Sequence, residues 1–138
     1  AQKLGATHLV DIATLTGACV VALGKVASGV FGEPQEWVQS VTGAAERTGE
    51  RLWQLPLYPE YREQLESELA DLKNVGGREG GACTAAAFLQ TFAGGKPWAH
   101  LDIAGTAWTE TARADGDAGA TGVMVRTMVE LAVSDRDW

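Results

Sequence analysis

Two short apolar runs stand out along the chain, Thr7 to Ala13 and Trp98 to Ala104. Runs of this length predict buried strands. Elsewhere apolar residues recur about three or four positions apart, which predicts amphipathic helices. Helices are expected over 17–23, 34–48, 59–69, 82–92 and 118–133. Strands that alternate with helices indicate an α/β fold, with a sheet of largely parallel strands flanked by helices.

The segments between these elements are polar or rich in Gly and Pro. Residues 26–31 suit a short strand, 52–58 an extended linker, and 109–117 a polar loop. The chain opens on AQKLG, which has the character of the last turn of a helix closed by Gly5. A helix that begins with its last turn indicates that residues 1–138 are the C-terminal part of something longer.

The two predicted strands end in the same way. Each carries an Asp followed by Ile-Ala, and small residues come next: Thr14-Leu15-Thr16-Gly17 in one case and Gly105-Thr106-Ala107 in the other. In parallel sheets, ligands bind outside the carboxyl ends of strands, where small residues let a ligand approach the backbone. The pattern predicts a rim suited to an extended, peptide-like ligand. Two tight β–α turns without a ligand explain the same residues.

Polar side chains interrupt both apolar runs. His8 and Asp11 lie in the first, and His100 and Asp102 in the second. Because a buried charge must be satisfied, these residues form either a metal cluster or a hydrogen-bonded pair between strands. Nothing in their spacing decides between the two.

Composition narrows the class of partner. Hydrophobic residues make up 46% of the 138 residues, enough to bury the core of one domain. The formal net charge of −7 opposes nucleic-acid binding. No apolar run approaches the ~20 residues that a membrane helix needs, so no membrane partner is expected. Cys19 and Cys83 lie in small-residue stretches and are expected to be buried free thiols, which fits a reducing cytosol.

The sequence gives little support for a nucleotide-binding loop or a serine nucleophile. The loop GGREGGACT lacks the Gly-Lys-Ser/Thr ending of a phosphate-binding loop, which counts against a nucleotide-binding domain. It suits a small anion such as a carboxylate at the start of a helix, or a flexible connection. No Ser lies in a Gly-x-Ser-x-Gly turn.

Six segments together resemble the C-terminal catalytic domain of the leucyl aminopeptidase (cytosol aminopeptidase) family. In chain order they are VDIATLTGAC, LWQLPL, ADLKN, GGACTAAAFL, WAHLDIAGTAW and GATG. The resemblance covers nearly the whole chain. It implies that residues 1–138 are a portion of an α/β catalytic domain from a cytoplasmic aminopeptidase that assembles as a hexamer and removes N-terminal residues from peptides.

The family uses two divalent metal ions, Mn²⁺, Zn²⁺ or Mg²⁺, to activate water and polarise the scissile carbonyl. Its signature for metal binding and catalysis, Asn-Thr-Asp-Ala-Glu-Gly-Arg, belongs before residue 1. The resemblance therefore implies no catalytic residue and no metal ligand in this chain, and the chain alone is expected to be inactive. A non-catalytic binding or assembly module derived from the same fold is the alternative.

What the resemblance carries over is substrate binding. Backbone groups of Thr14, Leu15, Thr16 and Gly17 match the turn that holds the peptide, and the Leu15 amide matches a position that helps to hold bicarbonate. Val75, Ala104 and Ala107 match the pocket for the N-terminal side chain. Some relatives carry Met in place of Ala107, so a roomier pocket that accepts Met, Leu and Phe is expected here.

Overall fold

A four-stranded sheet forms the centre of the fold, in the order β1-β4-β2-β3. The computed structural model describes residues 1–112 and 116–134. β1 pairs with β4 in parallel, β4 with β2 antiparallel, and β2 with β3 in parallel. The expected α/β sheet of largely parallel strands is therefore confirmed, with one antiparallel pairing at its centre. The strands are β1 (Leu9–Ala13), β2 (Ser28–Glu33), β3 (Leu52–Gln54) and β4 (Trp98–Asp102).

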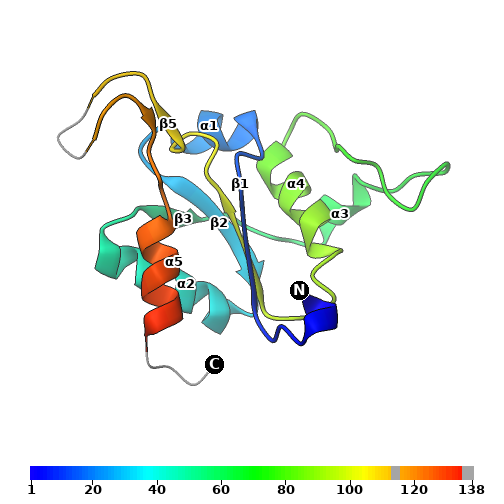
Figure 1. Cartoon of the computed structure of the whole chain (residues 1–138). Helices are drawn as coiled ribbons and strands as arrows, with labels where there is room; N and C mark the ends of the chain where they lie inside the picture. Colours follow the sequence, from blue (N-terminus) through cyan, green and yellow to red (C-terminus); the bar gives the residue numbers. More distant parts are fainter. Residues whose placement is uncertain (113–115, 135–138) are drawn as a thin grey trace.

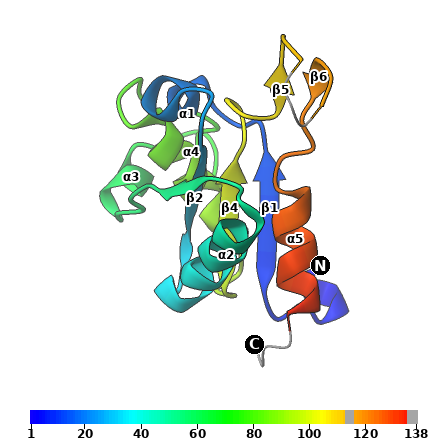
Figure 2. The same ribbon diagram turned by 90° about the vertical axis from the view of Figure 1, so that its left-hand side faces the viewer.

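Helices lie on both sides of this sheet. In Figure 1, α2 and α5 lie to the left of the strands and α3 and α4 to the right; Figure 2 shows the same elements from the left-hand side. The helices are α1 (Gly17–Leu23), α2 (Gln35–Thr48), α3 (Glu60–Glu63), α4 (Gly81–Gln90) and α5 (Val125–Val133), with a 3₁₀ turn, Gln2–Leu4, before β1. Gly5 closes that turn at φ +86°, as its sequence predicts.

Alternate residues of the strands point to two separate cores. Val30, Ala99 and Leu101 pack against α2 and α5. Phe31 and Trp98 pack on the opposite face, against residues of α1 and α4. The run that forms β4 is thus buried on both faces, as expected. The run that forms β1 is only half-buried, with Ile12 39% exposed, because β1 lies at the edge of the sheet.

Three expected segments differ from the structure. The helix expected over 59–69 ends at Glu63, and further along the Ser67 hydroxyl accepts the backbone N–H groups of Leu69 and Ala70 in a turn. The segment 52–58 is not only a linker, since its first three residues form the edge strand β3. The helix expected from residue 118 begins at Val125, because Gly119–Ala120 (β6) pairs with Trp108–Thr109 (β5) instead.

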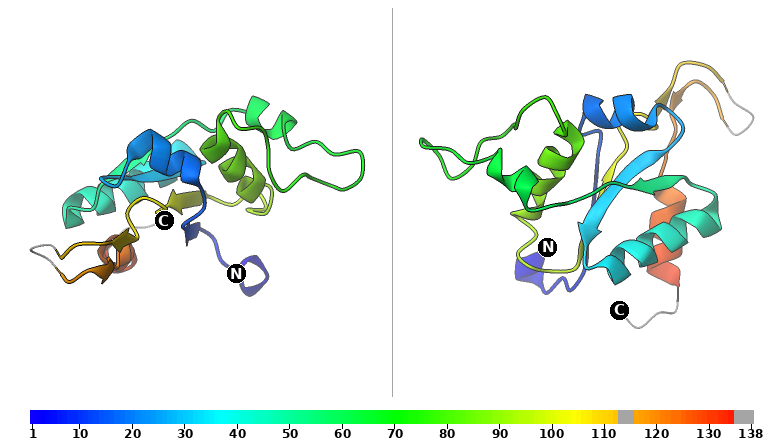
Figure 3. Two further views of the ribbon diagram at one scale, coloured as in Figure 1. Left: turned by 90° about the horizontal axis from the view of Figure 1, so that it is seen from above. Right: turned by 180° about the vertical axis from the view of Figure 1, so that it is seen from behind.

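Two segments extend from the body of the fold. The loop between α3 and α4 stands out on one side, and the β5–β6 ribbon on the other (Figure 3, right). The ribbon includes part of the expected polar loop 109–117, of which residues 113–115 lie outside the described residues. Within residues 1–112 and 116–134, no helix is long and apolar enough to span a bilayer.

Candidate functional site

The carboxyl ends of β1 and β4 meet at one edge of the sheet. The two strands run in parallel and in register, so that Ala13 lies beside Asp102. The backbone N–H of Ile103 donates to the Ala13 carbonyl at 2.9 Å and extends the pairing by one residue. As a result, the turn 14–17 after β1 and the turn 103–107 after β4 emerge side by side next to α1, at the top of Figure 1. These two turns are called the rim below.

One buried carboxylate, that of Asp102, ties the two turns of the rim together. It is 1% exposed. Its Oδ1 accepts the N–H groups of Leu15 at 3.2 Å and Ala104 at 3.1 Å. Its Oδ2 accepts the Thr16 hydroxyl at 2.7 Å. Hydrogen bonds from both turns therefore satisfy this charge, which fixes the position of each turn relative to the other.

Thr16 also starts helix α1. Its Oγ1 accepts the backbone N–H of Cys19 at 3.0 Å, the geometry of an N-cap. Because the same hydroxyl donates to Asp102, the beginning of α1 is anchored to the end of β4. The positive end of the short helix faces the carboxylate, which helps to offset its charge.

The rim presents backbone to solvent. Thr14, Leu15 and Gly17 are exposed, Thr16 is half-buried, and a Cβ built on Gly17 would meet nothing within 4 Å. The N–H of Gly17 belongs to the first turn of α1 and so has no partner within the helix. An extended chain can therefore approach this turn closely.

The small side chains expected to shape a pocket fall into two places. Ala104 and Ala107 lie in the turn after β4, and both are half-buried. Val75 lies elsewhere, in the loop between α3 and α4, and is 77% exposed. That loop returns to the rim at its end, since a Cβ on Gly81 would lie 3.2 Å from the Cβ of Ala18 in the first turn of α1. The structure thus brings six of the seven expected residues together.

The Leu15 amide is the position that the resemblance associates with bicarbonate. In this structure it donates to Asp102 at 3.2 Å. An anion at this amide would have to share its N–H with the Asp102 carboxylate. Electrostatic repulsion between the two negative groups opposes such sharing.

Of the four polar residues in the two apolar runs, Asp11 and His100 form a polar pair between β1 and β4. Asp11 and His100 are neighbours in the register of β1 and β4. Asp11 accepts the Trp98 indole N–H and bonds to Nδ1 of His100, both at 2.5 Å. His8 lies against Trp37 of α2, with ring centroids 4.7 Å apart. Of the two interpretations, a metal cluster or a polar pair between strands, the structure shows the second.

The metal ions that the resemblance implies do not fit the side chains described here. Across residues 1–112 and 116–134, no group of three or more His, Cys, Asp or Glu side chains is placed to hold a metal ion. Asp11 and Asp102 each use their oxygens in the hydrogen bonds above. No step of a reaction can therefore be assigned to a metal held by these residues.

Cys19 lies in α1 and Cys83 in α4, and both belong to the same buried cluster. Cys19 is 2% and Cys83 is 8% exposed, and neither forms a disulfide. Burial raises the pKa of the Cys19 thiol, and the nearby Asp102 charge raises it further. Burial likewise raises the pKa of Cys83. These are protonated core thiols, as the sequence predicts, and not nucleophiles.

The close contact between Gly105 and Gly24 could not be predicted from the sequence. A Cβ built on Gly105 would lie 2.1 Å from the carbonyl oxygen of Gly24, at the end of α1. The turn after β4 and the end of α1 therefore touch backbone to backbone. Only Gly at position 105 permits this approach.

Comparisons with known proteins agree with the resemblance. A probable cytosol aminopeptidase of Geobacter sp. (strain M21) is 55% identical over 130 residues, which are 94% of this chain and 26% of that protein. A probable cytosol aminopeptidase of Alkaliphilus metalliredigens (strain QYMF) is 51% identical over 134 residues, which are 97% of this chain and 27% of that protein. The chain thus spans about a quarter of the length of the curated relatives it matches.

Solved structures share the fold. A mutant of tomato leucine aminopeptidase superimposes with a TM-score of 0.87 at 40% identity, over 94% of this chain and 25% of that one. The bottromycin maturation enzyme BotP, in complex with Mn, superimposes with a TM-score of 0.85 at 43% identity. The match covers 91% of this chain and 28% of that one. Residues 1–129 match the catalytic domain of the cytosol aminopeptidase family. This chain therefore belongs to the cytosol aminopeptidase family, as part of its catalytic domain.

Proposed function

We propose that this chain supplies the substrate-binding rim of a metal-dependent aminopeptidase that releases N-terminal residues from peptides. The observation that carries the proposal is the Asp102 carboxylate, which holds the turns after β1 and β4 together while the backbone of Thr14–Gly17 faces solvent. An extended peptide binds along such an edge by main-chain hydrogen bonds, which do not depend on its sequence.

The two turns have different roles in this proposal. Thr14, Leu15, Thr16 and Gly17 bind the backbone of the substrate. Ala104 and Ala107, with Val75 from the loop before α4, line the pocket for its N-terminal side chain. Because these residues are small or exposed, the pocket accepts Met and Leu.

The reacting groups lie outside the described residues in this proposal. Two divalent ions, Mn²⁺, Zn²⁺ or Mg²⁺, are held by other parts of the catalytic domain, and they activate the attacking water when bound. This chain's own contribution is to orient the peptide. Bicarbonate, a hexameric assembly and a cytoplasmic location belong to the proposal through the family resemblance alone.

Aminopeptidase assays test the proposal at two levels. The 138-residue chain, with Mn²⁺ or Zn²⁺ added, is expected to show neither hydrolysis of a leucyl anilide nor tight metal binding by calorimetry. A chimera in which this chain replaces the matched segment of the Geobacter relative is expected to hydrolyse the same anilide. Turnover by the chain alone would show that the metal ligands are misplaced, and a folded, metal-loaded but inactive chimera would refute the substrate role.

A substitution in the chimera tests the side-chain pocket. Ala107→Met is expected to lower kcat/KM for leucyl and methionyl anilides more than for alanyl anilide, because the added side chain fills the pocket. Ala70→Met, at an exposed position in the α3–α4 loop, is the matched control and is expected to change neither. An equal response to all three anilides would remove Ala107 from the pocket.

A further inference from the structure

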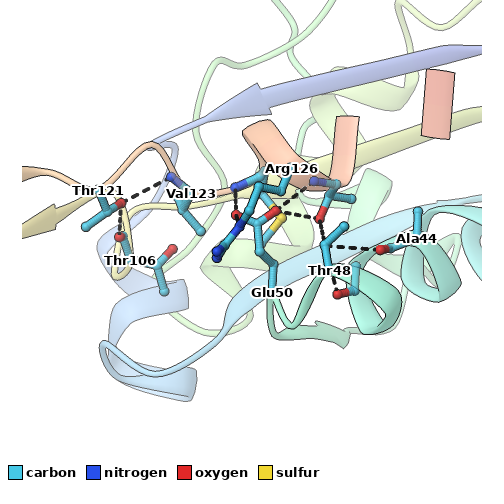
Figure 4. Close-up of polar contacts among 10 residues, drawn as sticks. Ala44, Thr48, Glu50, Thr106, Thr121, Val123 and Arg126 are labelled. Atoms are coloured by element: carbon cyan, nitrogen blue, oxygen red, sulfur yellow. Dashed lines mark hydrogen bonds and ion pairs between the residues drawn. The ribbon is translucent and has the colours of Figure 1, made fainter. Parts of the chain in front are cut away.

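A second pocket opens at the same end of the sheet as the rim. Its volume is about 440 Å³. Three segments far apart in the sequence supply its charged residues: Lys25 follows α1, Glu50 and Arg51 follow α2, and Arg126 lies at the start of α5. Figure 4 shows Arg126 above Glu50, with Thr106 and Thr121 beside them.

Positive charge dominates this pocket, although the protein as a whole is acidic. Lys25, Arg51 and Arg126 line it, and Glu50 is the one acidic residue among its described lining residues. The chain has 18 Asp and Glu against 11 Lys and Arg. The three cations around one cavity therefore contrast with the net negative charge of the whole chain.

The Glu50 carboxylate offsets at most one of these three charges, and most of its hydrogen bonds lie inside the fold. Its side chain is 4% exposed. Its Oε1 accepts the N–H of Met124 at 2.8 Å, and its Oε2 accepts the N–H and the hydroxyl of Thr127 at 2.8 and 2.7 Å. The charge is thus satisfied by the N-terminal turn of α5.

The cations keep most of their binding capacity. Arg126 has its Nε 3.7 Å from Oε1 of Glu50, and its side chain is 66% exposed. Among the described residues, neither Lys25 nor Arg51 forms an ion pair. With three positive groups and one shielded negative group, the pocket carries a charge of about +2, which favours the binding of an anion.

The neutral groups of the pocket are already engaged. The Thr121 hydroxyl donates to the Thr106 carbonyl at 2.8 Å, and the Thr106 and Ser28 hydroxyls lie 2.6 Å apart. Recognition must therefore come from the guanidinium and ammonium groups. Guanidinium groups bind phosphate oxygens through paired N–H donors, and an ammonium adds a point charge.

We propose that this pocket binds a phosphate dianion, either free or as a monoester of a small molecule, through Lys25, Arg51 and Arg126. The charge of a dianion matches that of the pocket, and three segments of the chain each supply one of the cations that line it. The pocket shares Thr106 with the rim, but its three cations lie outside the rim, and binding there does not depend on aminopeptidase activity.

A titration of the full chain tests this proposal. ¹⁵N-labelled protein at pH 8 and constant ionic strength receives inorganic phosphate, and glycerol phosphate in a second arm. Saturable shifts are expected at the backbone amides of residues 49–51 and 124–127 and at the side-chain Nε–H of Arg51 and Arg126. Stronger binding of glycerol phosphate identifies a monoester as the ligand, and equal binding identifies free phosphate.

Charge-neutral variants locate the site. Arg51→Gln and Arg126→Gln are each expected to weaken binding about tenfold, because each removes a charge-assisted contact. Arg62→Gln, on the exposed face of α3, removes the same charge elsewhere and is expected to leave binding unchanged. Lys25→Gln provides a further variant if either Arg substitution disturbs the circular dichroism spectrum. The proposal is overturned if chloride at the same ionic strength produces the same shifts, or if Arg62→Gln weakens binding as much as Arg51→Gln.

Discussion

The Thr16 hydroxyl donates a 2.7 Å hydrogen bond to the Asp102 carboxylate, although the two residues are 86 positions apart in the chain. The same hydroxyl accepts the Cys19 N–H and caps α1. A single side chain therefore connects the start of a helix to the end of a neighbouring strand, and the geometry of the rim depends on it.

Thr16→Val is expected to lower the free energy of unfolding by about 1–3 kcal/mol, because it removes a donor to a buried carboxylate and the cap of α1. Urea denaturation measures the change. Thr42→Val is the control, since the Thr42 hydroxyl donates only to carbonyls within α2 and its loss is expected to cost under about 0.5 kcal/mol. Equal stability of the two variants would show that the Thr16–Asp102 bond contributes nothing to the fold.

Asp11→Ala is expected to reduce stability by about 1–3 kcal/mol, because it leaves the buried His100 Nδ1 and the Trp98 indole N–H without their acceptor. Asp11→Asn keeps an acceptor oxygen and is expected to cost less. Urea denaturation is compared with Mn²⁺ titration of the metal-binding chimera. Loss of metal binding by Asp11→Ala with unchanged stability would mean that Asp11 is a metal ligand.

The buried thiols predict a loss of stability at alkaline pH. Because burial raises the pKa of Cys19 and Cys83, the folded protein keeps both protons at a pH where the unfolded chain has begun to lose them. Their contribution to stability is complete below the thiol pKa of the unfolded chain, about 8.5, and is lost as the pH rises through the folded pKa.

This pH effect is measured by urea denaturation between pH 7.5 and 9.5. The free energy of unfolding of the native chain is expected to fall more steeply than that of the double variant Cys19→Ala, Cys83→Ala. Parallel curves would contradict the assignment. Slow reaction of both thiols with a disulfide reagent in native buffer, and fast reaction in urea, is expected from the same burial.

Gly105→Ala is expected to destabilise the protein by at least about 1–3 kcal/mol, because the new methyl group would overlap the Gly24 carbonyl oxygen. Gly43→Ala is the matched change within α2, where the nearest atom to the new Cβ is Nη1 at the end of the Arg47 side chain, at 3.4 Å. It is expected to stabilise the protein by about 0.5–1 kcal/mol, since Ala favours a helix interior. Thermal unfolding of both variants checks the two signs.

The elements with strong local patterns were predictable from the sequence. The runs around Asp11 and Asp102 gave β1 and β4, and their parallel pairing placed both turns at one edge. The polar pair between strands was one of two alternatives, because the sequence does not show whether Asp11 faces His100 or a metal. The antiparallel direction of β2 and the short strand β3 depend on long-range packing, which leaves no mark in three to six residues.

The phosphate-binding pocket could not be predicted from the sequence, because it too depends on long-range packing. Lys25, Arg51 and Arg126 are ordinary surface residues in the sequence, and only the fold places them around one cavity. The sequence does not predict that Glu50 is buried either, since its neighbours Gly49 and Arg51 are typical of an exposed helix end. Long-range tertiary contacts, and not local patterns, create both features.

The pairing of β1 with β4 also bears on how the molecule assembles in time. The hydrogen bonds from Leu15 and Thr16 to Asp102 join residues 87 and 86 positions apart, so forming them carries the entropy cost of closing a long loop. A partly folded molecule that contains α2, β2 and β3 alone has no rim. Any ligand that needs both turns of the rim therefore binds only molecules in which β1 and β4 have paired, and its binding stabilises that state.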